Sequence, residues 1–192
     1  MGLRNTSTGW GWLARLFHWG MAVLIIGMLG FGFWLTLAYN PGDLAKFNQV
    51  QLHKSFGFCV FVLACLRLIW RGLNPTPPLP EHMPSHLRLG AHLGHWTLYV
   101  LMFAIPITGW LGVSSSPYND PGYMQIPNEV FGLFAMPDPY PEGSHDLSGL
   151  YMTIHFYLAL GLLLVLAAHI AAAIKHAVVD RDGVMKRMTS GS

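Results

Sequence analysis

Four long apolar segments restrict what this chain can fold into more than any other feature of its sequence. Each has the length of roughly 20 mostly apolar residues that a helix needs to cross a bilayer. Only 10% of the residues are charged, against about 25% in a typical soluble domain. The sequence therefore predicts an all-α integral membrane protein, a bundle of four transmembrane helices. The predicted spans cover about residues 12–38, 47–70, 89–113 and 147–179.

The connections between the spans carry turn and linker residues. Residues 40–43 read Asn-Pro-Gly-Asp, which is typical of a short turn. Residues 74–84 contain five prolines and are expected to form a stiff, extended linker. Residues 114–146 form the longest connection, which we expect to cap one face of the bundle. Because no internal repeat interrupts the pattern, we expect residues 1–192 to form a single domain.

Lys and Arg are distributed unevenly between the two sides that four crossings would create. The side without the termini has only Lys46 and Lys54, together with six acidic residues. Basic residues favour the cytoplasmic side of a membrane protein. The distribution therefore predicts that both termini are cytoplasmic and that the outer face is acidic. The nine basic residues on the predicted inner side are Arg4, Arg15, Arg67, Arg71, Arg88, Lys175, Arg181, Lys186 and Arg187.

Four of the histidines within the predicted spans fall at two depths, and a histidine in a membrane span is costly and usually functional. His18 lies about six residues into the first span, and His53 about six residues into the second, which starts on the opposite side. His155 lies near the outer end of the fourth span. His169 follows it by 14 residues, or about 21 Å at the rise of an α-helix. His18 thus shares an inner level with His169, and His53 shares an outer level with His155.

This spacing favours two haem groups over other readings. Because 14 residues are close to four helical turns, His155 and His169 point in nearly the same direction from one helix. A bis-histidine haem iron needs two imidazoles on facing helices at equal depth, and bundle cores are a usual place for such cofactors. Zinc is a weaker alternative because it needs four close ligands. For any single histidine, a hydrogen bond across helices is the alternative. Cys59 and Cys65 form no CxxCH motif, so nothing indicates a covalently attached haem.

Three further histidines lie near the inner ends of the third and fourth spans. His92 and His95 are three residues apart, and His176 follows His169 by seven residues on the same helix face. A quinone head group needs hydrogen-bond donors for its carbonyls and a source of protons, which these side chains could supply. The alternative is that they are interfacial histidines in contact with water.

The histidines belong to a series of short motifs that covers almost the whole chain. The motifs are Phe17-His18-Trp19, Leu52–Gly57, Arg67 with Trp70-Arg71, Pro75–Pro78, Ala91–His95, Ile154-His155-Phe156 and the tail from His169 to Met188. In this order they resemble the bacterial cytochrome b561 family of four-helix, di-haem b membrane proteins. The resemblance implies a multi-pass protein of the bacterial inner membrane. It also implies that His18 with His169 and His53 with His155 ligate two haems b, with a quinone site near the inner haem.

One branch of this family is a superoxide oxidase, which passes an electron from superoxide through both haems to ubiquinone. An anionic donor would be drawn by positive charge on the outer face. Residues 114–146 contain no Lys or Arg, however, so only Lys46 and Lys54 could attract superoxide. This lack of positive charge concerns the identity of the electron donor and does not affect the general electron-transfer role.

Three functions remain as hypotheses. The first is an oxidoreductase that passes electrons between an outer donor, superoxide in one form, and membrane quinone, with ubiquinone as the expected substrate. The second is a membrane anchor and electron relay for a periplasmic redox protein, which would dock on the acidic outer connection. The third is a haem-free transporter or scaffold. The lipid bilayer is an expected partner in each case, and nucleic acid is not.

Overall fold

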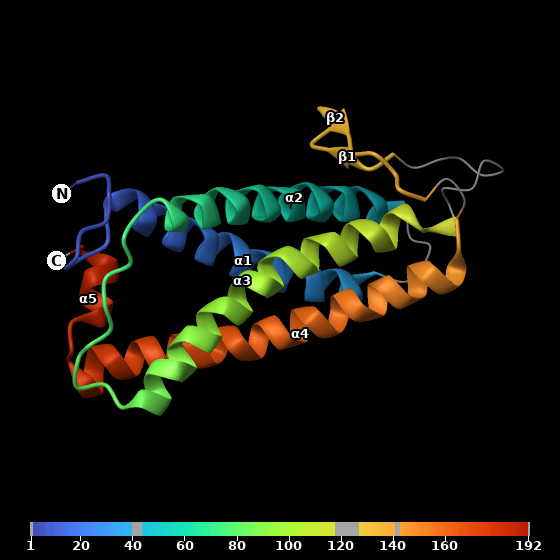
Figure 1. The fold of residues 1–192 in the computed structure, drawn as a ribbon. Helices are drawn as coiled ribbons and strands as arrows, with labels where there is room; N and C mark the ends of the chain where they lie inside the picture. Colours follow the sequence, from blue (N-terminus) through green and yellow to red (C-terminus); the bar gives the residue numbers. More distant parts are fainter. Residues whose placement is uncertain (1, 40–43, 118–126, 141–142, 192) are drawn as a thin grey trace. The chain divides into compact units, whose positions relative to one another are not determined.

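The computed structural model describes residues 2–39, 44–117, 127–140 and 143–191. Within these ranges, every long element is an α-helix (Figure 1). Four helices are long and apolar enough to cross a membrane, which confirms the predicted all-α fold with four spans. They are α1 Trp12–Ala38, α2 Leu44–Gly72, α3 Ser85–Ser114 and α4 His145–Lys175.

The helix ends differ from the predicted spans by a few residues. The bounds of α1 are as predicted, whereas α2, α3 and α4 each begin two to four residues earlier. The start of α3 has a local cause, because the carbonyl of Pro84 accepts hydrogen bonds from the amides of Leu87 and Arg88. Pro106 lies inside α3 without ending it, as membrane helices tolerate. The predicted turn at residues 40–43 lies outside the described residues.

The chain turns sharply after α4. A short π-helical segment, η2 His176–Asp180, leads into α5 Val184–Thr189. Arg181 (φ 49°) and Gly183 (φ 79°) adopt the left-handed conformation that commonly ends a helix. The predicted fourth span covers α4 apart from its first two residues and most of η2, while α5 was not predicted.

The connection between α3 and α4 contains an antiparallel hairpin that the sequence analysis did not predict. Its strands are β1 Glu129–Val130 and β2 Phe134–Ala135, with Val130 opposite Phe134. Phe131 (φ 51°) and Gly132 (φ 68°) form the turn. The predicted cap over one face of the bundle includes residues 118–126 and 141–142, which lie outside the described residues.

The chain divides into two compact units, each of which contains a part of all four long helices. Nine of the 11 Lys and Arg residues belong to the first unit, because only Lys46 and Lys54 belong to the second. The charge asymmetry found in the sequence therefore follows the division between the units. The first unit comprises Met1–Val23, Leu63–Val100 and Leu162–Ser192, and the second Leu24–Val62 and Leu101–Gly161.

Candidate cofactor sites

The second unit brings together His53 of α2 and His155 of α4. Their ring centroids lie 6.3 Å apart, with an angle of 77° between the ring planes. A metal ion between two imidazoles, each at a typical histidine–metal distance of about 2.0–2.1 Å, separates the ring centres by about 6 Å. The two rings therefore have the spacing that an iron atom held between them requires.

The tautomer of the neutral His155 ring is set by a neighbouring helix. Its Nδ1 donates a hydrogen bond to the carbonyl oxygen of Ile105 in α3 over 2.9 Å. A neutral imidazole with a proton on Nδ1 carries a lone pair on Nε2. Metal-ligating histidines commonly donate their second ring nitrogen to a carbonyl in this way. The contact thus leaves Nε2 of His155 as the ligating atom.

Two glycines leave room for these rings. A Cβ atom added at Gly109 would lie 3.0 Å from both Cε1 and Nδ1 of His155. One added at Gly32 would lie 3.2 Å from Cε1 of His53. Both separations are tighter than ordinary van der Waals contact, so a side chain at either position would press on the ring. Gly109 belongs to none of the motifs recognised in the sequence.

The first unit brings together His18 of α1 and His169 of α4. Their ring centroids lie 6.1 Å apart, with the planes at 36°. Trp19 stacks on His18 at 5.0 Å. His95 of α3 joins the same group, with its ring centroid 5.3 Å from that of His169. The unit therefore contains a histidine pair like that of the second unit, with a third histidine beside it.

The described residues around both pairs fit a haem b held by two histidines. Nδ1 of His18 and Nδ1 of His53 are buried without a hydrogen-bond partner in the described part of the chain. Buried polar atoms are nearly always paired, so both rings remain available to a ligand that the chain does not supply. A zinc site would need a closer set of four donors. Among the described residues, the one group of three donor side chains within 4.8 Å lies elsewhere, at His176, Asp180 and Asp182.

Arginine and aromatic side chains form a cluster in the first unit. The guanidinium groups of Arg67 and Arg71 both lie 5.6 Å from the ring centre of Tyr99. Arg71 also lies 5.7 Å from the ring centre of Trp96. Such cation–π contacts stabilise a positive charge close to apolar surroundings. Arg67 and Arg71 belong to the sequence motifs, but those motifs do not predict these contacts.

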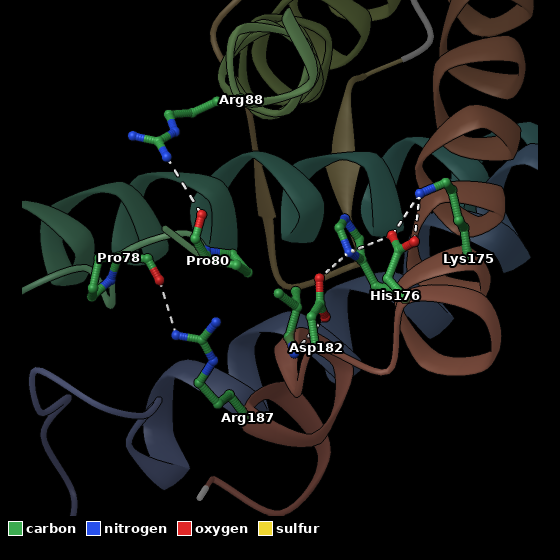
Figure 2. A network of polar contacts seen from close by, with 9 residues as sticks. Pro78, Pro80, Arg88, Lys175, His176, Asp182 and Arg187 are labelled. Atoms are coloured by element: carbon green, nitrogen blue, oxygen red, sulfur yellow. Dashed lines mark hydrogen bonds and ion pairs between the residues drawn. The ribbon is translucent and has the colours of Figure 1, made fainter. Parts of the chain in front are cut away.

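The remaining predicted site histidines have different surroundings. His92 is exposed on α3, whereas His176 lies in a polar network (Figure 2). Nδ1 of His176 lies 2.6 Å from Oδ2 of Asp182 and 3.4 Å from Oδ2 of Asp180. Lys175 donates to both carboxylate oxygens of Asp180, over 2.8 and 2.6 Å. Asp180 is thus paired mainly with Lys175, and Asp182 with His176.

Asp182 is a functional candidate that the sequence analysis missed. Its side chain is only 3% exposed, and that of His176 is 19% exposed. Burial raises the pKa of the Asp182 carboxyl, but hydrogen bonds from the Val184 amide and the His176 side chain outweigh it. The pKa of Asp182 is therefore held below its ordinary value. Its position six residues after His176 was visible in the sequence, but the turn that folds it back was not.

Comparison with known proteins identifies the family. The family model described as prokaryotic cytochrome b561 matches residues 9–191. The chain belongs to this family. As a cytochrome b561, it is a multi-pass membrane electron-transfer protein of the bacterial inner membrane that binds haem b. The resemblance carried by the sequence motifs is thus confirmed, and the haem-free hypothesis loses its support.

Two curated relatives cover nearly the whole cytochrome b561 chain. Cytochrome b561 homolog 2 of Escherichia coli (strain K12) is 35% identical over an alignment of 196 residues, which covers 100% of this chain and 97% of that protein. Probable superoxide oxidase CybB of Yersinia pestis is 31% identical over 180 residues, which cover 89% of this chain and 90% of that protein.

Proposed function

We propose that this cytochrome b561 binds two haems b and carries electrons between a donor at the outer face and membrane quinone, with ubiquinone as the substrate. The main support is the presence of one histidine pair in each compact unit, with ring spacings of 6.1 and 6.3 Å. Bound haem supplies one-electron transfer. Because two histidines would hold each iron, no position at the iron would be open to a substrate.

The proposed ligands are His18 with His169 and His53 with His155. His95 is the competing ligand in the first unit, because its ring lies closer to His169 than that of His18 does. We favour His18 because its spacing to His169 matches that of the other pair within 0.2 Å, the difference between 6.1 and 6.3 Å. His95 is then free to take part in quinone binding.

The ligand assignment is tested by the haem content of two variants, measured as the pyridine haemochrome per purified protein. His53→Ala is expected to lower the ratio from two haems to one, because His155 alone cannot hold a bis-histidine iron. His95→Ala is the matched control and is expected to keep both haems while quinone reduction slows. Two haems in His53→Ala with unchanged spectra would contradict the proposal. Haem loss in His95→Ala would make His95 a ligand.

The quinone site is proposed at His95 and His176, with protons drawn from the cytoplasm. Asp182 supports His176 in this role, since the contact between its carboxylate and Nδ1 leaves Nε2 as the nitrogen that can face a ligand. A histidine held by a buried carboxylate is oriented and is a good hydrogen-bond donor. His92 is exposed and makes no comparable contact in the described part of the chain.

Superoxide is the first candidate for the outer donor, because the 31% identical relative from Yersinia pestis carries the name probable superoxide oxidase. The acidic outer connection instead favours a cationic periplasmic redox protein, for which the chain would be a membrane anchor and relay. Lys54, which follows His53 directly, donates to Oδ1 of Asn128 over 2.9 Å. Its positive charge is therefore held beside the connection between α3 and α4.

A stopped-flow experiment separates the two donors. Air-oxidised holoprotein is mixed with a pulse of superoxide while the haem α-band is recorded. Fast reduction, with reoxidation only after ubiquinone is added, would support a superoxide:ubiquinone oxidoreductase. No reduction in a protein with an intact low-spin b spectrum would contradict superoxide as the donor and favour the periplasmic protein.

A further inference from the structure

The hairpin formed by β1 and β2 lies against α2, where the polar part of that helix ends. Phe131 meets Phe56 edge-on with ring centroids 5.3 Å apart, and Phe134 meets Phe58 in the same way at 5.7 Å. Figure 1 shows the hairpin on the side of α2 that faces away from α3 and α4. The aromatic side chains of the hairpin therefore extend along an outward side of a membrane-spanning helix.

Polar side chains of α2 hold the base of the hairpin in this position. Ser55 Oγ accepts a hydrogen bond from the amide of Phe131 over 2.9 Å. Lys54 donates to Asn128 over 2.9 Å, and Gln51 donates to the carbonyl of Pro127 over 3.2 Å. These bonds also hold Phe131 in a left-handed conformation that residues with a bulky side chain rarely adopt. The orientation of the hairpin is thus determined by contacts with α2.

The polar anchors stop where the apolar stretch of α2 begins. From Phe56 to Leu66 the sequence of α2 contains no charged, amide or hydroxyl side chain. This stretch lies within the span predicted for α2 at residues 47–70. Because Phe56 and Phe58 are the first aromatic residues of the stretch, the hairpin meets α2 at the N-terminal end of its apolar stretch.

The tip of the hairpin exposes a cluster of apolar side chains. Leu133 is 79% exposed, Phe134 50% and Phe131 43%. The described residues 127–140 contain no Lys or Arg that would keep this tip in water. Clustered Phe and Leu side chains at the surface of an anchored element are typical of segments that insert about 5–10 Å into a membrane interface.

We propose that residues 131–134 are a membrane wedge, whose apolar side chains insert among the lipids of the leaflet at the N-terminal end of α2. Lipid is the occupant because the cluster continues an apolar surface that α2 already presents to the bilayer. The wedge holds the connection between α3 and α4 beside Lys54, next to His53. This inference does not depend on the electron donor or on the number of haems.

The wedge is tested with the full-length holoprotein in proteoliposomes. Cys59 and Cys65 are first replaced by Ala, and a spin label is attached at Leu133→Cys or, as the matched control, at Glu129→Cys in the same hairpin. The Leu133 label is expected to collide several-fold more with oxygen than with a water-soluble nickel complex, and the Glu129 label to show the reverse. Equal access of the nickel complex to both labels would overturn the wedge, whether or not a partner protein covers this site in the cell.

A second measurement avoids substitution altogether. Lipids with a photoreactive diazirine in the acyl chain are reconstituted with the unmodified protein, illuminated and analysed by peptide mass spectrometry. We expect cross-links within residues 131–134, and none at the exposed residues 137–139 of the same connection. If residues 131–134 remain unlabelled while the spanning helices are labelled, the wedge is wrong.

Discussion

At the scale of single residues, His155 is positioned by two uncharged residues of α3. The carbonyl of Ile105 accepts its Nδ1 proton, and Gly109 leaves the space that its ring occupies. A carbonyl oxygen has two lone pairs, so Ile105 can make this contact in addition to any helical hydrogen bond. Ile105 of α3 thus sets the tautomer of His155. Gly109, one turn further along α3, leaves the space for the His155 ring.

We expect Gly109→Val to lose one of the two proposed haems. The new Cβ would lie 3.0 Å from the ring of His155, and two methyl groups would crowd it further, so the imidazole must move away from His53. Gly90→Val is the control on the same helix, because a Cβ atom there meets nothing within 4 Å. Pyridine haemochrome per protein should halve in the first variant and stay unchanged in the second. Equal haem content in both would refute the role of Gly109.

In the proposed quinone site Asp182 acts through His176, so its loss should affect quinone chemistry and leave the haems in place. Charge-assisted hydrogen bonds contribute about 1.5–3 kcal/mol, so Asp182→Asn is expected to slow quinone reduction by about tenfold or more. The pH profile of the reaction should shift as well, because the Asp182 carboxylate, whose pKa is lowered in the folded protein, is replaced by an amide that does not titrate. Asp180→Asn is the matched control, since that carboxylate is bound mainly by Lys175. Unchanged rates and pH profile in Asp182→Asn would exclude this positioning role.

At the scale of elements, α5 is too short to form a stable helix alone. Its residues are tied to distant parts of the first unit. Trp19 donates to the carbonyl of Met188 over 3.1 Å, and Arg15 to that of Thr189 over 2.7 Å. Arg187 donates to the carbonyl of Pro78 over 2.9 Å (Figure 2). The proline-rich linker contributes the carbonyl group of Pro78, and α1 contributes two donors, so the short helix α5 depends on tertiary contacts.

The turn between η2 and α5 should loosen in acid. Because the pKa of Asp182 is lowered from 3.8 in the folded state, its contacts stabilise the turn fully above that value. The contribution is lost as the pH falls through the lower pKa of the folded protein. Hydrogen exchange over residues 176–189 should therefore be slower in the wild type than in Asp182→Asn at pH 6. The difference should shrink towards pH 2; if it persists there, the ionised carboxylate is not its source.

At the scale of the whole molecule, charge distribution supports the proposed orientation. All basic residues other than Lys46 and Lys54 belong to the unit that contains both terminal segments. Cytoplasmic loops carry the excess of Lys and Arg in multi-pass proteins. The proton source of the quinone site and the position of the outer donor both depend on this orientation.

A reporter fused to the C-terminus tests this orientation. We expect green fluorescent protein, which fluoresces when it folds in the cytoplasm, to be bright, and alkaline phosphatase, which needs periplasmic oxidation, to be inactive. The same pair of reporters fused after residue 80 should give the same result, since the linker after α2 shares that side. An active phosphatase at either place would contradict the proposed orientation and place each histidine pair nearer the opposite side of the membrane.

The sequence by itself determined the four spans, and from them it predicts the depths of the histidines. Apolar length is a local property, and the rise of a helix is constant, so residue spacing converts directly into depth. For this reason the sequence predicts matching levels for His18 and His169, and likewise for His53 and His155. Their role as haem ligands stays a prediction that the variants above can decide.

Only the tertiary structure revealed the hairpin on α2, the docking of α5 and the pairing of His176 with Asp182. The contact between Ser55 and Phe131 joins residues 76 positions apart, and that between Trp19 and Met188 joins residues 169 apart. Two-residue strands and a six-residue helix carry almost no periodic signal of their own. They form because distant polar groups and apolar surfaces meet once the long helices have folded, and no local pattern encodes that meeting.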